Sequence, residues 1–144
     1  MNKYAISLMV LIGLLSAVSW RVSAQEVPVL TATLHSETPP AKSIDAGAQY
    51  VDVARITLTA SVGDVYINGI YLATDVLGGL SNFTNIYIYD VTSGGSTLLG
   101  TYPNQSANPN LITLGNVIIP NGGTPKTYLV KASLSSSAAG NVRL

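Results

Sequence analysis

Residues 50–60, Tyr-Val-Asp-Val-Ala-Arg-Ile-Thr-Leu-Thr-Ala, decide the fold class of this chain. From residue 54 onward apolar and polar side chains alternate, which is the period of a strand with one buried and one solvated face. Val51 and Val53 stand in the opposite phase, and this change of phase predicts a β-bulge near residue 53. The stretch therefore predicts a β-strand that packs one face against a core.

Similar apolar or alternating segments flank this strand and are separated by Gly, Pro and Asn turns such as 93–96 and 120–123. The further predicted strands are 29–35, 64–73, 83–90, 97–102, 111–119 (one strand or two short ones) and 126–134. Asn68-Gly69 marks a second change of phase and predicts a second bulge or a sharp bend. No segment after the N-terminal region shows a convincing helical period. Short strands at roughly ten-residue spacing predict an all-β sandwich.

Composition narrows the classes of function. The 144 residues fit one domain. Only 10% of them are charged, with 7 basic and 7 acidic residues, so a basic nucleic-acid surface is not expected. The chain has no cysteine, which excludes a disulfide framework, a thiol nucleophile and a Cys-ligated metal. His35 is the only histidine, and no nucleotide-binding or hydrolase motif is present, so an enzyme is not expected.

Residues 1–24 have the pattern of a secretory signal peptide. A basic start at Lys3 precedes an uncharged run from Tyr4 to Trp20, and Val22-Ser23-Ala24 fits a cleavage site with small residues. A retained membrane anchor is the alternative, although the run is near the lower length limit for a bilayer span. We therefore expect a secreted or cell-surface protein. Cleavage leaves a chain with a net charge of about −2, so we expect it to bind neither membrane nor nucleic acid.

Three stretches carry a resemblance to a known class of module: Ser-Glu-Thr-Pro-Pro-Ala-Lys, Gly-Asp-Val-Tyr-Ile-Asn-Gly-Ile, and Val-Ile-Ile-Pro-Asn-Gly-Gly-Thr-Pro-Lys-Thr-Tyr-Leu-Val-Lys. With these segments the chain resembles immunoglobulin-like β-sandwich modules of bacterial and archaeal surface-layer, adhesin and filament proteins. The likeness covers about residues 30–144. It implies a single immunoglobulin-like sandwich and no catalytic residue. Such modules continue their last strand past the position of Leu144, so the resemblance also implies an incomplete last strand here.

A sandwich that lacks part of a strand can be completed by a strand from a neighbouring subunit. Residues 25–40 supply a candidate donor, because an uncharged strand is followed by Pro39-Pro40, which we expect to act as a hinge before a sandwich domain at 41–144. Camelysin-type fibre subunits and archaeal pili share this outline, which is an analogy of architecture alone. The candidate donor residues are Val27, Val29, Leu30, Ala32 and Leu34.

Three other sets of side chains are candidate sites. Tyrosine supplies most of the aromatic residues, and Tyr66, Tyr71, Tyr87 and Tyr89 are expected on adjacent strands as a binding stripe for a glycan or a protein, with cross-strand pairing within the sheet as the alternative. The candidate Ca²⁺ ligands are Asp64, Asp75 and Asp90, and turn capping is their alternative role. Asn82 and Asn104 begin N-x-Ser/Thr triplets that are candidate glycosylation sites.

Two functions follow from these patterns. The first is an exported structural subunit of an extracellular filament or surface layer, which self-associates into a homopolymer through β-strand complementation. The second is an adhesin-like binding module for a surface glycan or protein. No cofactor is required by either function, and Ca²⁺ is the one metal that the loop carboxylates suggest.

Overall fold

The computed structural model describes residues 26–40, 43–71, 79–103 and 111–138 of the chain. These ranges hold β-strands and one short 3-10 turn, and no α-helix. The elements are β1 (Val29–Leu34), β2 (Val51–Ser61), β3 (Val65–Tyr71), η1 (Gly79–Asn82), β4 (Phe83–Asp90), β5 (Thr97–Tyr102), β6 (Leu111–Ile119) and β7 (Lys126–Leu134). The predicted all-β fold is confirmed, and 111–119 forms one strand.

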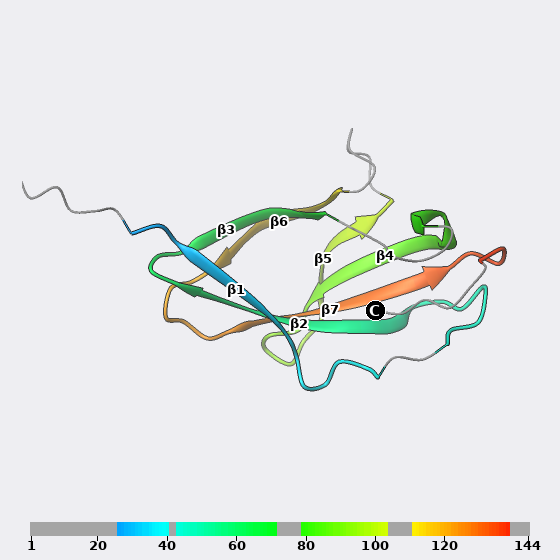
Figure 1. The fold of residues 1–144 in the computed structure, drawn as a ribbon, viewed down its shortest axis with the longest axis horizontal. Helices are drawn as coiled ribbons and strands as arrows, with labels where there is room; N and C mark the ends of the chain where they lie inside the picture. The colour runs from blue at the N-terminus through cyan, green and yellow to red at the C-terminus, as the bar shows by residue number, and fades with distance from the viewer. Residues whose placement is uncertain (1–25, 41–42, 72–78, 104–110, 139–144) are drawn as a thin grey trace, which may run out of the picture.

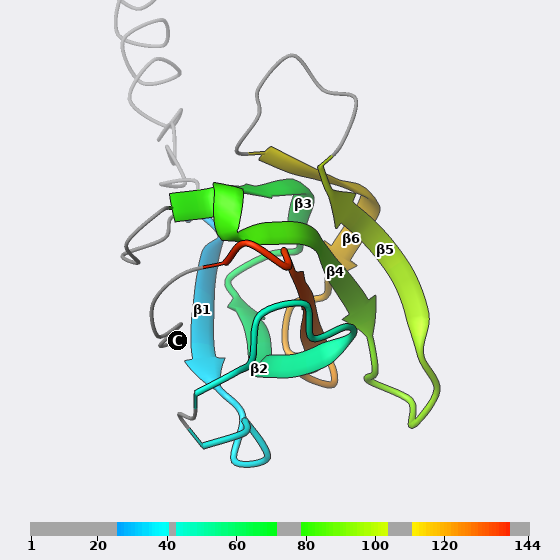
Figure 2. The same ribbon diagram turned by 90° about the vertical axis from the view of Figure 1, so that its right-hand side faces the viewer.

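The strands build a β-sandwich of two antiparallel sheets (Figure 1). The larger sheet has the order β1-β2-β7-β4-β5, and β3 pairs with β6 in the smaller one. At one side of the sandwich β5 lies against β6, which brings the two sheets together (Figure 2). At the other side β1 is the edge strand of the larger sheet and, among the residues that the structure describes, pairs only with β2. The fold is therefore closed on the β5 side and ends in a free strand on the β1 side.

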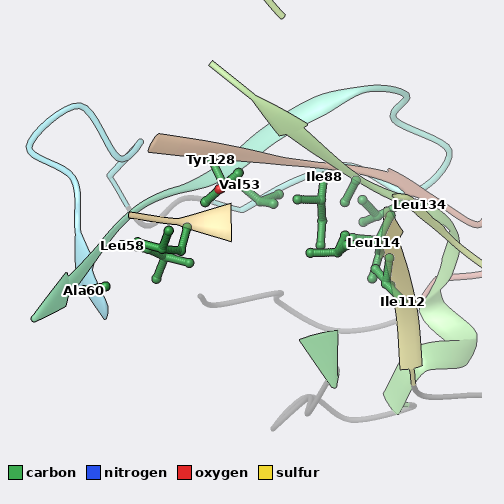
Figure 3. Packing of buried hydrophobic residues seen from close by; sticks show 11 residues of the cluster. Val53, Leu58, Ala60, Ile88, Ile112, Leu114, Tyr128 and Leu134 are labelled. Carbon is green, nitrogen blue, oxygen red and sulfur yellow. The ribbon is translucent and has the colours of Figure 1, made fainter. Parts of the chain in front are cut away.

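The core lies between the sheets and follows the predicted alternation. Ile86 and Ile88 of β4 point inward, so the orientation that the sequence left open is settled with Tyr87 and Tyr89 on the outer face. Figure 3 shows Ile88 of β4 and Leu134 of β7 gathered in one cluster with Ile112 and Leu114 of β6. The largest fully buried apolar side chains are Ile88, Ile112, Ile119 and Leu134.

The bulge predicted near residue 53 is confirmed, whereas at Asn68-Gly69 the structure has a register shift whose extra residues lie on β6, because residues 67–69 stand opposite residues 113–117. The register of β2 against β7 shifts between Asp52 and Ala54, and that of β3 against β6 shifts between Ile67 and Gly69. The first shift explains how Val53 can be buried although it stands in the opposite phase to Leu58.

Two expectations about the chain ends fall outside the described residues: the signal peptide over 1–24 and the short last strand at 141–144. In the described ranges, none of the structure is a helix of the length and apolar character that a bilayer crossing requires. The strand expected to stand apart from the sandwich as a donor is β1, and the structure pairs it with β2 of the same chain.

Candidate functional site

Strand β1 is the most exposed element of the sandwich. All six of its residues are exposed, and the twelve buried apolar side chains found among the described residues all come from other strands. Residues 27–34 nevertheless hold four of the ten exposed large apolar side chains in the same part of the chain: Val27, Val29, Leu30 and Leu34. Apolar edge strands are commonly blunted by charge, proline or a covering element, and β1 itself carries neither a charge nor a proline. This edge is therefore suited to pairing with another strand.

The register shows which face of β1 is apolar. Leu30, Ala32 and Leu34 lie directly opposite Ala60, Leu58 and Ile56 of β2, so they share the face of the sheet that forms the core. The exposed fractions of Leu30 and Leu34 are 41% and 73%, whereas those of Ala60 and Leu58 are below a tenth. The buried apolar row of β2 thus continues onto β1 as an exposed row. A second strand or sheet placed over this row would bury it.

The segment after β1 is fastened to Arg55. The His35 N–H donates to the Arg55 carbonyl at 2.9 Å. The Thr38 hydroxyl donates to the same carbonyl at 2.7 Å and accepts from the Arg55 N–H at 3.1 Å, and Glu37 forms an ion pair with the Arg55 guanidinium. These bonds hold the chain just before Pro39-Pro40. This clasp, the set of bonds from His35, Glu37 and Thr38 to Arg55, could not be predicted because Arg55 and Thr38 are seventeen residues apart and no local pattern links them.

The tyrosines lie on two different outer faces instead of in one stripe. Tyr66 and Tyr71 are exposed on β3 of the smaller sheet, whereas Tyr87 and Tyr89 lie on β4 of the larger sheet. The expectation that all four lie on adjacent strands is wrong, because β4 pairs with β5 and β7 and not with β3. Alternation fixed which side chains share a face of one strand, but it does not identify the neighbouring strand.

A stacked tyrosine cluster covers part of the larger sheet. The rings of Tyr50 and Tyr87 have centroids 5.0 Å apart at 22°, and those of Tyr87 and Tyr89 are 6.4 Å apart. The neighbouring Tyr50 hydroxyl raises the pKa of Tyr87. Lys131, opposite Tyr87 in the register, pairs with Asp52 at 2.6 Å. The cluster is thus an aromatic surface bordered by one ion pair, and it includes Tyr50, which the sequence did not place with the other two.

The carboxylates stand in turns. Asp64 Oδ1 accepts the Asn121 N–H at 2.8 Å, and Asp90 Oδ1 accepts the Thr92 N–H at 2.9 Å. Asp75 lies outside the described residues. Across the part of the chain that the structure describes, no three His, Asp or Glu side chains come together as a set able to hold a metal. The observed bonds assign Asp64 and Asp90 to turn capping.

The two glycosylation candidates differ in what the structure says of them. Asn82 is only 6% exposed at the end of η1, so a glycan on this side chain would not fit the folded sandwich. Its triplet is instead used in packing, because the Thr84 hydroxyl donates to the Ser133 carbonyl at 3.1 Å. Asn104 lies outside the described residues.

One buried hydroxyl has no hydrogen-bond partner. Tyr128 is 3% exposed in the core, and its Oη is the one such buried side-chain atom left unsatisfied among the described residues. Burial and then the charge of Asp90, which lies opposite Tyr128 in the register, raise the pKa of Tyr128 to about 12. The site therefore keeps the Tyr128 phenol neutral near physiological pH.

Replacing Tyr128 by phenylalanine is therefore expected to leave stability near neutral pH unchanged or higher, because an unpartnered buried hydroxyl costs about 1–3 kcal/mol. The raised pKa adds a pH dependence. Between pH 10 and about 12 the unfolded chain loses this proton while the folded chain keeps it, so the wild type loses about 1.4 kcal/mol of stability per pH unit. Urea unfolding of both proteins at pH 8 and pH 11 measures this difference. If Tyr128→Phe were less stable than the wild type at pH 8, the claim that the Tyr128 hydroxyl has no hydrogen-bond partner would be wrong.

Comparisons with protein-family profiles, with curated proteins and with solved structures found no match. The candidate sites therefore stand on the geometry of this chain alone: the exposed β1 edge first, and the tyrosine cluster second.

Proposed function

We propose that this chain is an exported structural subunit of an extracellular filament or surface layer, and that its subunits assemble through β-strand complementation at β1. In this proposal residues 1–24 are a signal peptide and the sandwich is of the immunoglobulin-like kind. One observation carries it: β1 presents a row of exposed apolar side chains and a free edge, yet contributes no buried side chain to its own core. Removing β1 from its own sheet would therefore cost little core packing.

Two further features support self-association. After cleavage the chain would carry a net charge of only about −2, and low net charge weakens the repulsion between copies. The clasp at Arg55 ends where Pro39-Pro40 begins, so an exchanged β1 could carry residues 35–38 with it and make the same bonds to Arg55 of another subunit. The proposal involves no catalytic step, no cofactor and no nucleic acid.

The test is the mass of purified residues 25–144 across a range of concentrations, measured by size-exclusion chromatography with light scattering. The proposal predicts large particles or a mass that grows with concentration. A single monomeric species at all concentrations would contradict it.

The second candidate function is a binding module, which the stacked tyrosine cluster favours. Rings of this kind offer flat, amphipathic surface to a sugar ring or to a protein side chain. Replacing Tyr87 and Tyr89 together by serine is expected to weaken binding to a glycan array at least about tenfold, since two aromatic contacts are lost. The melting temperature should change little, because both rings lie on the outer face. Tyr66→Ser with Tyr71→Ser, on the other sheet, is the matched control, and equal effects of the two pairs would argue against this face.

A further inference from the structure

The hydrogen-bonding groups on the free edge of β1 can be assigned from the register. The His35 N–H donates to the Arg55 carbonyl, and Leu34 lies opposite Ile56, so residue 35 points its N–H toward β2. In an antiparallel ladder this direction alternates along the strand. The Gly122 N–H donates to the Ala60 carbonyl, on the opposite side of β2 from β1, which agrees with the same alternation. The free edge of β1 therefore carries the N–H and C=O groups of residues 30, 32 and 34.

The sequence of β1 is symmetric about the centre of this edge. Leu30-Thr31-Ala32-Thr33-Leu34 reads the same in both directions, and Ala32 is its midpoint. Two antiparallel copies centred on Ala32 place leucine opposite leucine, threonine opposite threonine, and alanine opposite alanine. In this arrangement residue 30 faces residue 34, and residue 32 faces residue 32. In each of these pairs the backbone groups of both residues point outward from their own sheets. Ala32 is thus both the midpoint of the symmetric sequence and a residue whose backbone N–H and C=O groups point outward.

We propose that the free edge of β1 binds β1 of a second copy of this chain, antiparallel, with Ala32 opposite Ala32 of that copy. Each pair of residues at 30, 32 and 34 then exchanges both backbone hydrogen bonds. The two five-stranded sheets become one sheet across a two-fold axis at Ala32. The leucines and alanines of both copies form one apolar row on the core side, and the threonines form a polar row on the other side.

The absence of charge on β1 permits this strand to pair with a second copy of itself, and its short length sets the strength of the contact. No charged residue lies between Val27 and Leu34, so no like charges meet when the strand pairs with itself. A pair of short edges buries less than the roughly 1,200 Å² of a standard stable interface. The contact is therefore expected to be weak between free subunits and to persist where the local concentration is high, as it is within an assembly.

This inference rests on the proposed function and adds to the exchange of β1 a second use of this strand, at its outer edge. A two-fold contact closes on itself and gives a dimer. A filament or layer then needs a second contact elsewhere on the subunit. The two proposals can therefore fail separately: the absence of the β1 pair contradicts this inference, and the absence of particles larger than a dimer contradicts the filament or layer.

Cross-linking tests the register, because the chain has no cysteine of its own. In purified residues 25–144, Ala32→Cys is expected to form a disulfide-linked dimer, since Cα atoms of a hydrogen-bonded pair lie about 5.5 Å apart, within disulfide range. Thr31→Cys is the matched control, equally exposed on the same strand. Its Cα would lie about 7–8 Å from that of its own mate, so its cross-linking should be roughly tenfold less.

Ala32→Pro tests the edge without removing β1 from its own sheet. Proline removes an outward N–H and is tolerated on an edge strand, so the melting temperature should stay close to that of the wild type. Both hydrogen bonds of the central pair are lost in the dimer, and self-association should weaken about tenfold or more.

Equal cross-linking of Ala32→Cys and Thr31→Cys, or undiminished association of Ala32→Pro, would overturn the inference. If filaments still form when one of these results is obtained, the proposal of a structural subunit stands and its assembly contact lies elsewhere on the subunit. Dimers that cross-link at residue 32 but never form larger particles would support the inference and contradict the filament proposal.

Discussion

Deletion of residues 25–36 from the exported chain is expected to abolish the formation of polymers and leave a folded sandwich. The deleted segment contains β1 and with it four of the ten exposed large apolar side chains, but none of the buried core. Glu37 and Thr38 remain, so the clasp to the Arg55 carbonyl and guanidinium is retained in part. Electron microscopy and light scattering of the two proteins, with circular dichroism as the check on folding, measure the effect.

A milder variant keeps this prediction testable if the deletion does not fold. Leu30→Thr with Leu34→Thr retains the strand and its hydrogen bonds and removes the exposed apolar row. This variant should also assemble poorly, because the apolar area available for burial is lost. Polymers of normal yield from both variants would show that β1 is not the assembling element.

Gly100→Val is expected to have the largest effect on stability. Gly100 lies in β5 where that strand meets β6, and a Cβ built on it would stand 2.6 Å from the Thr113 carbonyl oxygen and 2.7 Å from Ile112 Cγ2. Ile112 is fully buried, and the other contact is backbone, so β6 must move away. Overpacking of this kind costs about 1–3 kcal/mol or more, which corresponds to a melting temperature lower by roughly 5–15 °C.

Gly115→Val is the matched control for this substitution. Gly115 lies on β6, is exposed, and would have no atom within 4 Å of an added Cβ. A β-branched residue suits an exposed strand position, so its melting temperature should be unchanged or higher. Thermal unfolding of both variants by circular dichroism makes the comparison. Equal melting temperatures for the two would mean that the sheets do not approach each other at Gly100 as described.

The strands were predictable because burial of one face imposes a period of two on the sequence. The phase change at Val53 was enough to predict the bulge in β2, since a bulge is a local event in one strand, whereas the register shift at Asn68-Gly69 comes from extra residues on the partner strand β6. The turn at Pro120–Gly123 was predictable for the same reason: Gly122 has a positive φ of 61°, which glycine adopts without strain.

Pairing between distant strands was not predictable from these patterns. Nothing near Tyr66 or Tyr87 indicates that β3 and β4 belong to different sheets, and the expected tyrosine stripe failed on that point. The symmetry of residues 30–34 is visible in the sequence, but its meaning depends on which backbone groups face outward. That phase is known only after β1 has been placed in register with β2.

Negative-stain electron microscopy of purified residues 25–144 tests the central claim most directly, because the claim concerns assembly of the mature subunit and not its fold. The account predicts filaments or ordered sheets that are absent from the deletion of residues 25–36. Uniform isolated particles of monomer size at high protein concentration would contradict it.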